Sequence, residues 1–297
     1  MSYIEDYKSF QSEMLRLKGI TYRGYEKTLK EIGISYIGQT NNSSKLMHNA
    51  SINMLTYGLY LASSDLSNIN VCPKSAMCRE SCLVNSGRAK INTFANETVV
   101  IDSRITKTRL LFANKPLFMK LMIVEINRAI NKAKRLGMGF SIRLNCTSDI
   151  SPLVFRYNNK NILELYPNIN FYDYTKVKNH WNLVKKYKNY YLTFSRDGSS
   201  ENDKECAEWL KMGNNVAVVF GVTKTADLPK KWKGYEVLCG DDYDYRLWDK
   251  LTPNKQIVGL IYKTSASDFE VRNGKHYFKG VPKSPFIIDK DDKDCEW

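Results

Sequence analysis

Seven segments of this 297-residue chain carry the apolar and aromatic patterns of buried β-strands, and they constrain the fold more than any other feature. Most of them are followed by a stretch with helical spacing of apolar residues or by a polar loop. An alternation of strands and helices predicts a parallel sheet with right-handed crossovers, either a doubly wound sheet or a (β/α) barrel. The strand-like segments are 53–65, 139–149, 168–176, 190–200, 214–221, 235–242 and 256–263.

Two observations favour the barrel. No G-x-G-x-x-G motif follows the first strand, so the usual dinucleotide fingerprint is absent. Polar and charged residues recur at the C-terminal end of nearly every strand, where barrel enzymes place their sites, although loops after strands are often polar in any case. These residues are Arg143, Asn145, Ser148, Asp149, Asp173, Tyr174, Lys176, Ser195, Arg196, Glu201, Asp241, Asp242, Arg246 and Lys263. We therefore expect an α/β fold, a partial (β/α) TIM-like barrel of parallel strands.

The expected domain plan has three parts. Residues 1–50 form an N-terminal helical appendage, residues 51–270 form the barrel-like domain, and residues 271–297 form a C-terminal extension. A long helical region is expected over 96–136, with Gly137 as its C-cap. The other expected helices and connectors are helices at 3–18, 24–32, 153–166, 177–188, 201–213 and 244–251, and a polar connector at 38–45.

Cys72, Cys78 and Cys82 lie within the stretch VCPKSAMCRESCLVNSGR, in a C-x5-C-x3-C spacing. Three soft thiolates on one short loop suit an iron–sulfur cluster or a zinc ion. Three protein ligands in place of four leave one metal position open for a substrate or cofactor. The loop 72–82 leaves the first strand, so we expect it at the edge of the sheet that the other strand ends face. We favour a [4Fe–4S] cluster.

Zinc is the alternative metal. Zinc sites usually pair C-x2-4-C units with a distant second pair, and this chain has no such pair. A fourth zinc ligand could come from Cys146 or Cys239, both at strand ends. The three histidines are distant in sequence from the cysteine loop, and buried or unligated cysteines are the remaining reading.

The net charge of +14 favours polyanionic partners, nucleic acid or nucleotides, unless it serves solubility alone. Residues 270–286, EVRNGKHYFKGVPKSPF, interleave basic and aromatic side chains in a way that suits base stacking. Apolar runs fall short of the ~20 residues that cross a bilayer, and the N-terminus lacks the plan of a signal peptide. We expect a cytoplasmic protein with no membrane partner; the sequence assigns no oligomeric state.

The cysteine triplet on a loop after the first strand of a partial barrel resembles the radical S-adenosylmethionine superfamily. That resemblance implies a [4Fe–4S] cluster with one iron open to S-adenosylmethionine. The usual spacing there is C-x3-C-x2-C with an aromatic residue before the last cysteine, where this chain has Ser81. The Gly-Gly-Glu-type stretch after the second strand is also missing.

A second resemblance rests on short motifs in a fixed order. They are VCPKSAMCRESC, RLNCTSDI, FYDYTK, LTFSRDGSSEN, VAVVF, CGDDYDYR and IVGLIYK, and they span about residues 45–263. In this order they resemble the phage gene product 88 family, with Cys146 where a glycine is expected. The resemblance implies a bacteriophage or prophage origin and the cytoplasm of the bacterial host, but no reaction.

Two functions compete. The first is an enzyme that acts on nucleotides or nucleic acid, with the cysteine cluster as cofactor. Lys176 and Arg196 would hold a phosphate or carboxylate, and Asp241 or Asp242 would accept a ribose hydroxyl or act as a base. The second is a non-catalytic nucleic-acid-binding protein with a structural iron–sulfur or zinc site. The expected catalytic residues are Asp149, Lys176, Glu201, Asp241 and Asp242, and the expected cofactor contacts are Arg143, Asn145, Ser148, Tyr174, Ser195, Arg196 and Arg246.

Overall fold

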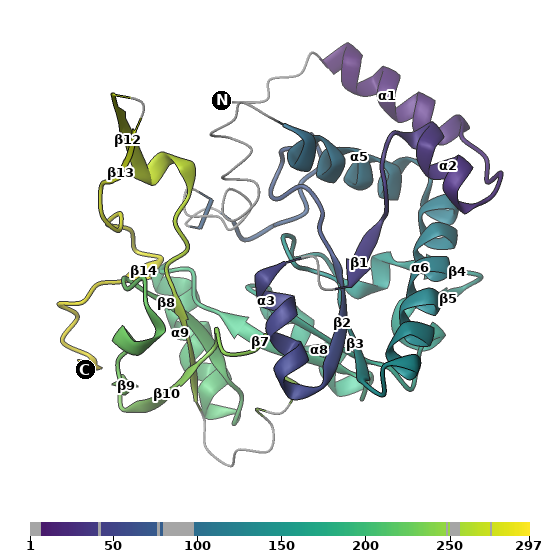
Figure 1. The fold of residues 1–297 in the computed structure, drawn as a ribbon. Helices are drawn as coiled ribbons and strands as arrows, with labels where there is room; N and C mark the ends of the chain where they lie inside the picture. The colour runs from purple at the N-terminus through teal and green to yellow at the C-terminus, as the bar shows by residue number, and fades with distance from the viewer. Residues whose placement is uncertain are drawn as a thin grey trace.

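A largely parallel sheet organises the protein, and all seven predicted strand segments form strands in it (Figure 1). The structure, a computed structural model, describes residues 7–40, 43–75, 78–79, 98–247, 249, 256–273 and 275–297. The parallel strands, in their order across the sheet, are β2 (Met54–Leu59), β3 (Gly139–Arg143), β6 (Asn170–Thr175), β7 (Tyr190–Ser195), β8 (Val216–Phe220), β11 (Ile257–Ile261) and β10 (Tyr235–Cys239).

The ends of this sheet are antiparallel. β1 (Gly38–Thr40) pairs with β2 at one end, where the sequence indicated a connector, and β9 (Lys231–Trp232) and β15 (Cys295–Glu296) follow β10 at the other. β11 lies between β8 and β10, so the last two parallel strands are exchanged relative to chain order. The α/β class with a parallel sheet is confirmed; among the strands that the structure describes, the hydrogen-bonded order runs from β1 to β15 without closing.

Helices α5 (Val99–Ala113) and α6 (Lys115–Arg135) replace the single helical region expected over 96–136. Asn114 separates them with a non-helical backbone (φ −145°, ψ 66°), and its side chain caps α6 by accepting from the Leu117 N–H. The side-chain amide of Asn114 also donates to the carbonyls of Leu17 and Ile20. Leu136, not the predicted Gly137, is the C-cap of α6, and Gly137 follows it with a left-handed backbone (φ +64°), as is common for glycine directly after a C-cap.

The first 50 residues share the main core with the sheet. Helices α1 (Tyr7–Gly19) and α2 (Tyr25–Ile32) bury Leu17, Leu29 and Ile32 in it. The buried Glu125 of α6 joins these parts, because its carboxylate accepts from the Tyr57 hydroxyl (2.6 Å) on β2 and from the Gly38 N–H (2.8 Å) on β1. Each bond gives a buried polar group a partner that water would otherwise supply.

The predicted helix over 153–166 is wrong. The segment forms the short 3-10 helix η3 (Pro152–Val154), a hairpin of β4 (Arg156–Tyr157) and β5 (Lys160–Asn161), and helix α7 (Ile162–Leu165). Asn158 and Asn159 adopt left-handed backbone angles, φ 47° and 63°, which make a two-residue turn. Asn tolerates this conformation better than most residues, so the pair reverses the chain where a helix would continue.

The later crossovers match the prediction more closely. η4 (Lys178–His180) and α8 (Trp181–Lys186) follow β6, and α9 (Ser200–Lys211) follows β7. Trp209 of α9 is buried against Phe194 of β7, with ring centroids 5.0 Å apart. The helix expected over 244–251 is not formed at residues 244–246, which are irregular and buried.

The polar side of β2, β3 and β6, which carries Thr56, Ser141 and Tyr172, is called the inner face here. Two short helices, α3 (Ser44–Met47) and η1 (His48–Ile52), lie on it together with the segment after β10. Asn49 of η1 donates to the Thr56 hydroxyl (2.8 Å) and accepts from the Asp244 N–H (2.7 Å). The inner face is therefore covered by polar contacts together with a small buried cluster of Tyr172, Tyr191 and Tyr245.

The C-terminal residues add to the sheet at two places. β14 (Ile287–Ile288) runs parallel to β8 at Val219 and Phe220, just beyond the two residues with which β8 pairs with β7. A Cβ on Gly198 would lie 2.1 Å from the Pro285 carbonyl oxygen, so only glycine fits beneath this strand. The hairpin of β12 (Phe269–Arg272) and β13 (Lys275–Phe278) projects from the body (Figure 1). Among the described residues, none of the helices has the length and apolar character needed to span a bilayer.

Candidate functional site

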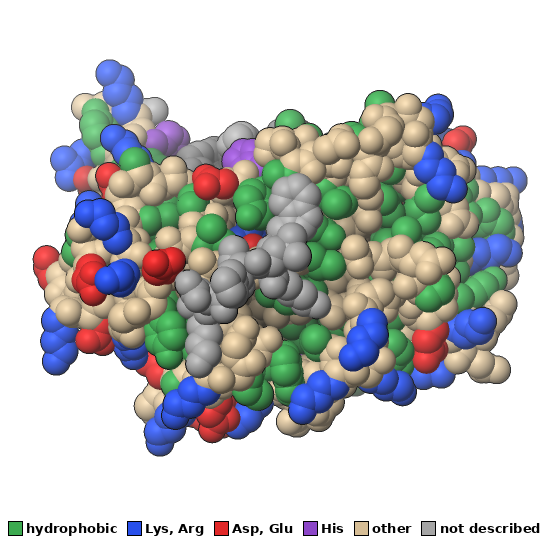
Figure 2. Space-filling model, turned by 90° about the horizontal axis from the view of Figure 1, so that it is seen from below, with side chains coloured by type: hydrophobic (Ala, Val, Ile, Leu, Met, Phe, Trp, Pro, Cys, Tyr) green, Lys and Arg blue, Asp and Glu red, His purple; other side chains and the backbone are tan. Residues whose placement is uncertain are grey.

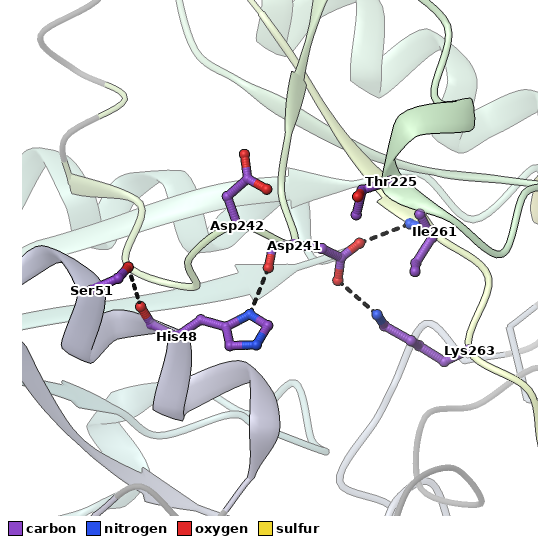
Figure 3. Close-up of a pocket in the computed structure, with 7 residues that line it drawn as sticks. All are labelled: His48, Ser51, Thr225, Asp241, Asp242, Ile261 and Lys263. Carbon is purple, nitrogen blue, oxygen red and sulfur yellow. Dashed lines mark hydrogen bonds and ion pairs between the residues drawn. The ribbon is translucent and has the colours of Figure 1, made fainter.

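A pocket of about 430 Å³ lies at the C-terminal ends of β10 and β11 (Figure 3). It is lined by His48, Ser51, Thr225, Asp241, Asp242, Ile261 and Lys263. These residues come from η1, from the short 3-10 helix η5 (Thr225–Asp227) after β8, and from the ends of both strands. The predicted strand-end residues Asp241, Asp242 and Lys263 are thus brought together in one cavity.

Asp241 orients two other side chains of the pocket. Its backbone carbonyl accepts from Nδ1 of His48 (2.8 Å), and its Oδ1 forms an ion pair with Nζ of Lys263 (3.0 Å) (Figure 3). The other carboxylate oxygen accepts from the Ile261 N–H (2.9 Å), which fixes the carboxylate itself. A carbonyl can only accept, so Nδ1 of His48 carries a proton. In the neutral imidazole, Nε2 is then the basic nitrogen.

The pocket is open to solvent. His48 and Asp242 are exposed, and the Lys263 side chain is 38% exposed. The Asp242 carboxylate points away from the His48 ring in Figure 3 and receives a contact from the Cys239 thiol (3.2 Å). Burial raises the pKa of Cys239, so this thiol stays protonated at neutral pH. The site therefore combines a base, a cation and an accessible carboxylate.

A buried ion pair between Arg143 and Asp244 lies on the inner face, and Asp244 follows the pocket residue Asp242 by two positions in the chain. Asp244 is fully buried and accepts two hydrogen bonds of 2.8 Å from NH1 of Arg143. Tyr172 donates to the same carboxylate (2.8 Å), and Nζ of Lys45 lies 3.3 Å from it. Burial alone would raise the pKa of Asp244, but the charges of Arg143 and Lys45 outweigh it and hold the pKa well below its usual value.

Tyr174 and Arg246 extend this network. The Tyr174 ring centroid lies 4.8 Å from Nζ of Lys45 and 4.8 Å from the guanidinium carbon of Arg143. Arg246 is fully buried, donates to the backbone carbonyls of Tyr243 and Asp244, and lies 3.5 Å from the Asp249 carboxylate. Three of the predicted cofactor contacts, Arg143, Tyr174 and Arg246, are therefore brought together.

A third cluster lies at the C-terminal end of β6. Asp149 accepts from the Thr175 hydroxyl (2.8 Å) and the Lys176 N–H (2.7 Å), and Nδ1 of His180 lies 3.1 Å from the same hydroxyl. Burial raises the pKa of Asp149 and lowers the pKa of His180, although the negative charge of Asp149 opposes the second shift. The Asp149 N–H donates to the Val71 carbonyl (2.8 Å), which places this cluster beside the cysteine loop.

The cysteine loop begins at the C-terminal edge of β2 and β3, as the sequence indicated. The Cys72 thiol contacts the Thr147 carbonyl (3.8 Å), and the Cys78 thiol contacts the Ser75 carbonyl (3.7 Å). Both are half-buried, and Cys82 lies outside the described residues. Within the described ranges, no three His, Cys, Asp or Glu side chains converge to hold a metal ion. The thiols suit a soft metal or cluster in chemistry, but their mutual arrangement as ligands stays a prediction.

Cys146 and Cys239, which the sequence offers as a fourth zinc ligand, have other contacts. The buried Cys146 thiol lies 3.7 Å from the Arg143 carbonyl, and burial raises its pKa to about 12. Cys239 faces Asp242 in the pocket.

The remaining predicted residues serve several local roles. Asn145 donates from its backbone and side chain to Asp173, and Ser148 donates to the Asn145 side chain (2.8 Å). These bonds shape the loop after β3. The Ser195 carbonyl accepts from Asn202, and the exposed Glu201 lies 3.7 Å from Lys74.

Arg196 and Lys176 contact the C-terminal segment of the chain itself. Arg196 donates to the Pro285 carbonyl (2.7 Å) and forms an ion pair with Asp203 (2.8 Å). Nζ of Lys176 lies 5.6 Å from the Phe286 ring centroid. The side chains expected to hold a phosphate are thus partly engaged by residues 285–286.

Several residues of these clusters escaped the sequence analysis. His48, Lys45 and Asp244 were not singled out, because α3 and η1 precede the first parallel strand and carry no motif. Their roles depend on contacts between residues nearly 200 positions apart, which no local pattern reports. His180 was not singled out either, although it follows a strand end, as Asp149 does.

Fold and site together define an α/β protein with polar clusters at the C-terminal edge and on the inner face of a parallel sheet. The chain belongs to the gene product 88 family of phage proteins, whose family model matches residues 23–275. No curated protein and no solved structure matches it. The resemblance to radical S-adenosylmethionine enzymes therefore has no support beyond the cysteine triplet.

Proposed function

We propose that this protein is an enzyme that binds a nucleotide, or a nucleic-acid phosphate, in the pocket of Figure 3 and removes a proton from the substrate. The observation that carries the proposal is the double role of Asp241, which orients His48 as a base and Lys263 as a cation. Nε2 of neutral His48 accepts a proton from a substrate hydroxyl or a water, and Lys263 offsets the charge of the phosphate.

Size and charge agree with this substrate class. A volume of about 430 Å³ falls in the range of small-molecule pockets, and the exposed His48 and Asp242 leave the pocket open to solvent. The Asp242 carboxylate can accept from a ribose hydroxyl, while Ser51 and Thr225 supply further hydroxyl groups. The net charge of +14 draws polyanions toward the protein at long range.

The cysteine loop is part of the same proposal. Cys72, Cys78 and Cys82 would hold a [4Fe–4S] cluster at the edge of a partial (β/α) barrel, with zinc as the alternative metal. Support comes from the two described thiols, half-buried on one short loop beside the end of β3. Such a cluster supplies an electron or an open coordination position, to which the amino-acid end of S-adenosylmethionine is one candidate ligand.

The test measures binding and turnover separately. Each common ribonucleoside and deoxyribonucleoside 5′-monophosphate is titrated by calorimetry into the wild type and the Lys263→Met variant. Loss of the cation should weaken binding about tenfold, as expected for a charge-assisted contact of roughly 1.4 kcal/mol. Lys134→Met removes an exposed lysine from α6 as a matched control and should leave binding unchanged.

Turnover is followed by mass spectrometry of the same nucleotides and of a 5′-phosphorylated oligonucleotide. The His48→Gln variant should bind like the wild type and lose conversion, because glutamine cannot take up the proton. Equal binding by Lys263→Met and the wild type would contradict the assignment of the pocket.

A second candidate function, nucleic-acid binding without catalysis, is favoured by the β12–β13 hairpin. Tyr277 and Phe278 are 46% and 44% exposed there, beside Arg272 and Lys275. On the face seen in Figure 2, the lysine and arginine side chains that are drawn in colour lie mostly around the margin. Salt-dependent binding of a single-stranded oligonucleotide that is lost in Tyr277→Ala, with no conversion of any nucleotide, would favour this function over the enzyme.

A further inference from the structure

The environment of Tyr174 on the inner face is unusual for a tyrosine. Its ring lies within 4.8 Å of two cations, Lys45 and Arg143. Its hydroxyl is buried and has no hydrogen-bond partner among the residues that the structure describes. A buried hydroxyl without a partner is costly, so this hydroxyl calls for an acceptor that the described residues do not provide.

Arg143, on the neighbouring strand β3, also has a buried donor without a hydrogen-bond partner among the described residues. The side chain is nine-tenths buried, and both contacts to Asp244 use NH1. Its Nε–H is buried and, within the described ranges, donates to no acceptor. Two hydrogen-bond donors from adjacent strands, one of them charged, are thus left for an acceptor that the described residues do not provide.

The charge balance identifies the kind of acceptor. Lys45, Arg143 and Arg246 bring three positive charges to this part of the inner face, and Asp244 and Asp249 bring two negative charges. The buried Asp173 also interacts with Arg143, but burial raises its pKa to about 7, so it adds only a partial negative charge at neutral pH. Asp244 already accepts from Arg143 and Tyr172 and lies near Lys45, so its bonding capacity is largely used. The cluster therefore retains an excess of positive charge together with unmet donors.

We propose that Tyr174, Arg143 and Lys45 form a second ligand site, which binds one compact oxyanion, a carboxylate or a phosphate group. The oxyanion accepts from the Tyr174 hydroxyl and the Arg143 Nε–H, and the Lys45 ammonium lies beside it. Such charge-assisted bonds are stronger than neutral ones, and a guanidinium matches the planar geometry of a carboxylate or the face of a phosphate.

The cluster reaches the surface at Lys45, whose side chain is 20% exposed, and Tyr174 is only partly buried. The Tyr174 hydroxyl and the Arg143 Nε–H are themselves buried, and Arg246 and Asp244 are fully buried. A ligand with an extended tail could therefore place its anionic end against Tyr174 and leave the tail toward solvent. The site shares no side chain with the pocket of His48 and Lys263, so each can fail without the other.

The test uses the full-length protein and two small probes, sodium phosphate and sodium acetate, added at equal ionic strength. Thermal unfolding and calorimetric titration are measured for the wild type, Tyr174→Phe and Lys45→Met. Tyr166→Phe is the matched control, because its hydroxyl bonds Asn127 at the surface of the protein.

The wild type and Tyr166→Phe should be stabilised by one of the probes, and the apparent dissociation constant should rise at least tenfold in Tyr174→Phe and in Lys45→Met. Without ligand, Tyr174→Phe should unfold at or above the wild-type temperature, since it removes a hydroxyl that lacks a partner. A response to phosphate but not acetate assigns a phosphate ligand, and the reverse assigns a carboxylate.

No response of the wild type to either probe overturns the proposal, as does a response that Tyr174→Phe retains in full. The Lys263→Met variant separates the two sites, because it should lose nucleotide binding in the pocket and keep the response at Tyr174.

Discussion

Nδ1 of His48 donates to the backbone carbonyl of Asp241 at 2.8 Å, across 193 positions of the chain. The bond joins the helix before the first parallel strand to the loop after β10, at the far end of the parallel strands. It also selects one tautomer, because a carbonyl oxygen offers no proton. The reactivity of His48 is therefore set by the backbone, independently of the Asp241 carboxylate.

The first prediction concerns this tautomer. We expect the neutral His48 imidazole to be protonated at Nδ1 and to keep this form in the Asp241→Asn variant, since the carbonyl is unchanged. Nitrogen-15 NMR of histidine-labelled protein measures it, and His48→Gln assigns the signal. A dominant Nε2–H form would remove the basis for His48 as a base.

The second prediction concerns the buried ion pair. Asp244→Asn should cost about 3–5 kcal/mol in the free energy of unfolding at pH 7, because it leaves Arg143 buried without its counter-charge. The folded-state pKa of Asp244 lies below its unfolded value, so its contribution is present above about pH 4 and is lost as the pH falls further.

Urea unfolding at pH 7 and at pH 3 checks both parts, provided that the protein is folded at the lower pH. The difference in the free energy of unfolding between the wild type and Asp244→Asn should be smaller at pH 3 than at pH 7. The exposed Asp242→Asn is the control and should change stability by less than about 0.5 kcal/mol. A difference in unfolding free energy that grows as the pH falls would contradict the lowered pKa of Asp244.

The third prediction concerns Asp173, whose effect on stability depends on pH in the opposite direction to that of Asp244. Burial raises the pKa of Asp173 to about 7, against hydrogen bonds from Asn145 and Tyr190 that favour the charged form. Between about pH 4 and pH 7 the folded state therefore binds a proton that the unfolded state has lost, and stability falls as the pH rises. Ionisation of Asp173 should lower the free energy of unfolding by up to about 4 kcal/mol across this window.

Asp173→Asn removes the titration and keeps an oxygen that can accept from the Asn145 N–H. Its stability relative to the wild type should accordingly improve between pH 5 and pH 8 in chemical denaturation. If the difference between the two proteins stays constant over this range, Asp173 does not titrate there.

The fourth prediction concerns the cysteine loop. Protein purified without oxygen should contain iron and sulfide, and alanine at Cys72, Cys78 or Cys82 should each remove the iron. Cys206→Ala is the control, because that thiol is buried on α9 beside Asn202 and should not affect metal content. A colourless protein that contains zinc would exclude the iron–sulfur cluster.

The strands were predictable because each carries its own signal. VAVVF and IVGLI are apolar enough to be buried on both faces, and they pair as β8 and β11. The exchanged order of β10 and β11 could not be predicted, since strand order is decided by packing between segments. The helix expected over 153–166 failed for a local reason, as Asn158 and Asn159 accept left-handed angles that a spacing rule overlooks.

The candidate sites divide in the same way. Asp241, Asp242 and Lys263 were accessible to sequence analysis because strand ends are defined positions in a parallel sheet. His48 and Lys45 were not, because their partners lie in the loop after β10 and only the folded chain brings them together. The charge excess around Tyr174 likewise appears only when β3, β6 and α3 are assembled.

The positions of β14 and β15 have a consequence for folding during synthesis. Ile287 and Ile288 pair with β8 beyond the residues that pair with β7, and β15 forms the end of the sheet next to β9. Both strands follow all seven parallel strands in the chain, so they are synthesised after them. Until β14 and β15 are synthesised, the flank of β8 and the free side of β9 lack their partner strands. A polypeptide truncated before Ile287 would therefore expose unpaired strand backbone that can pair with other chains.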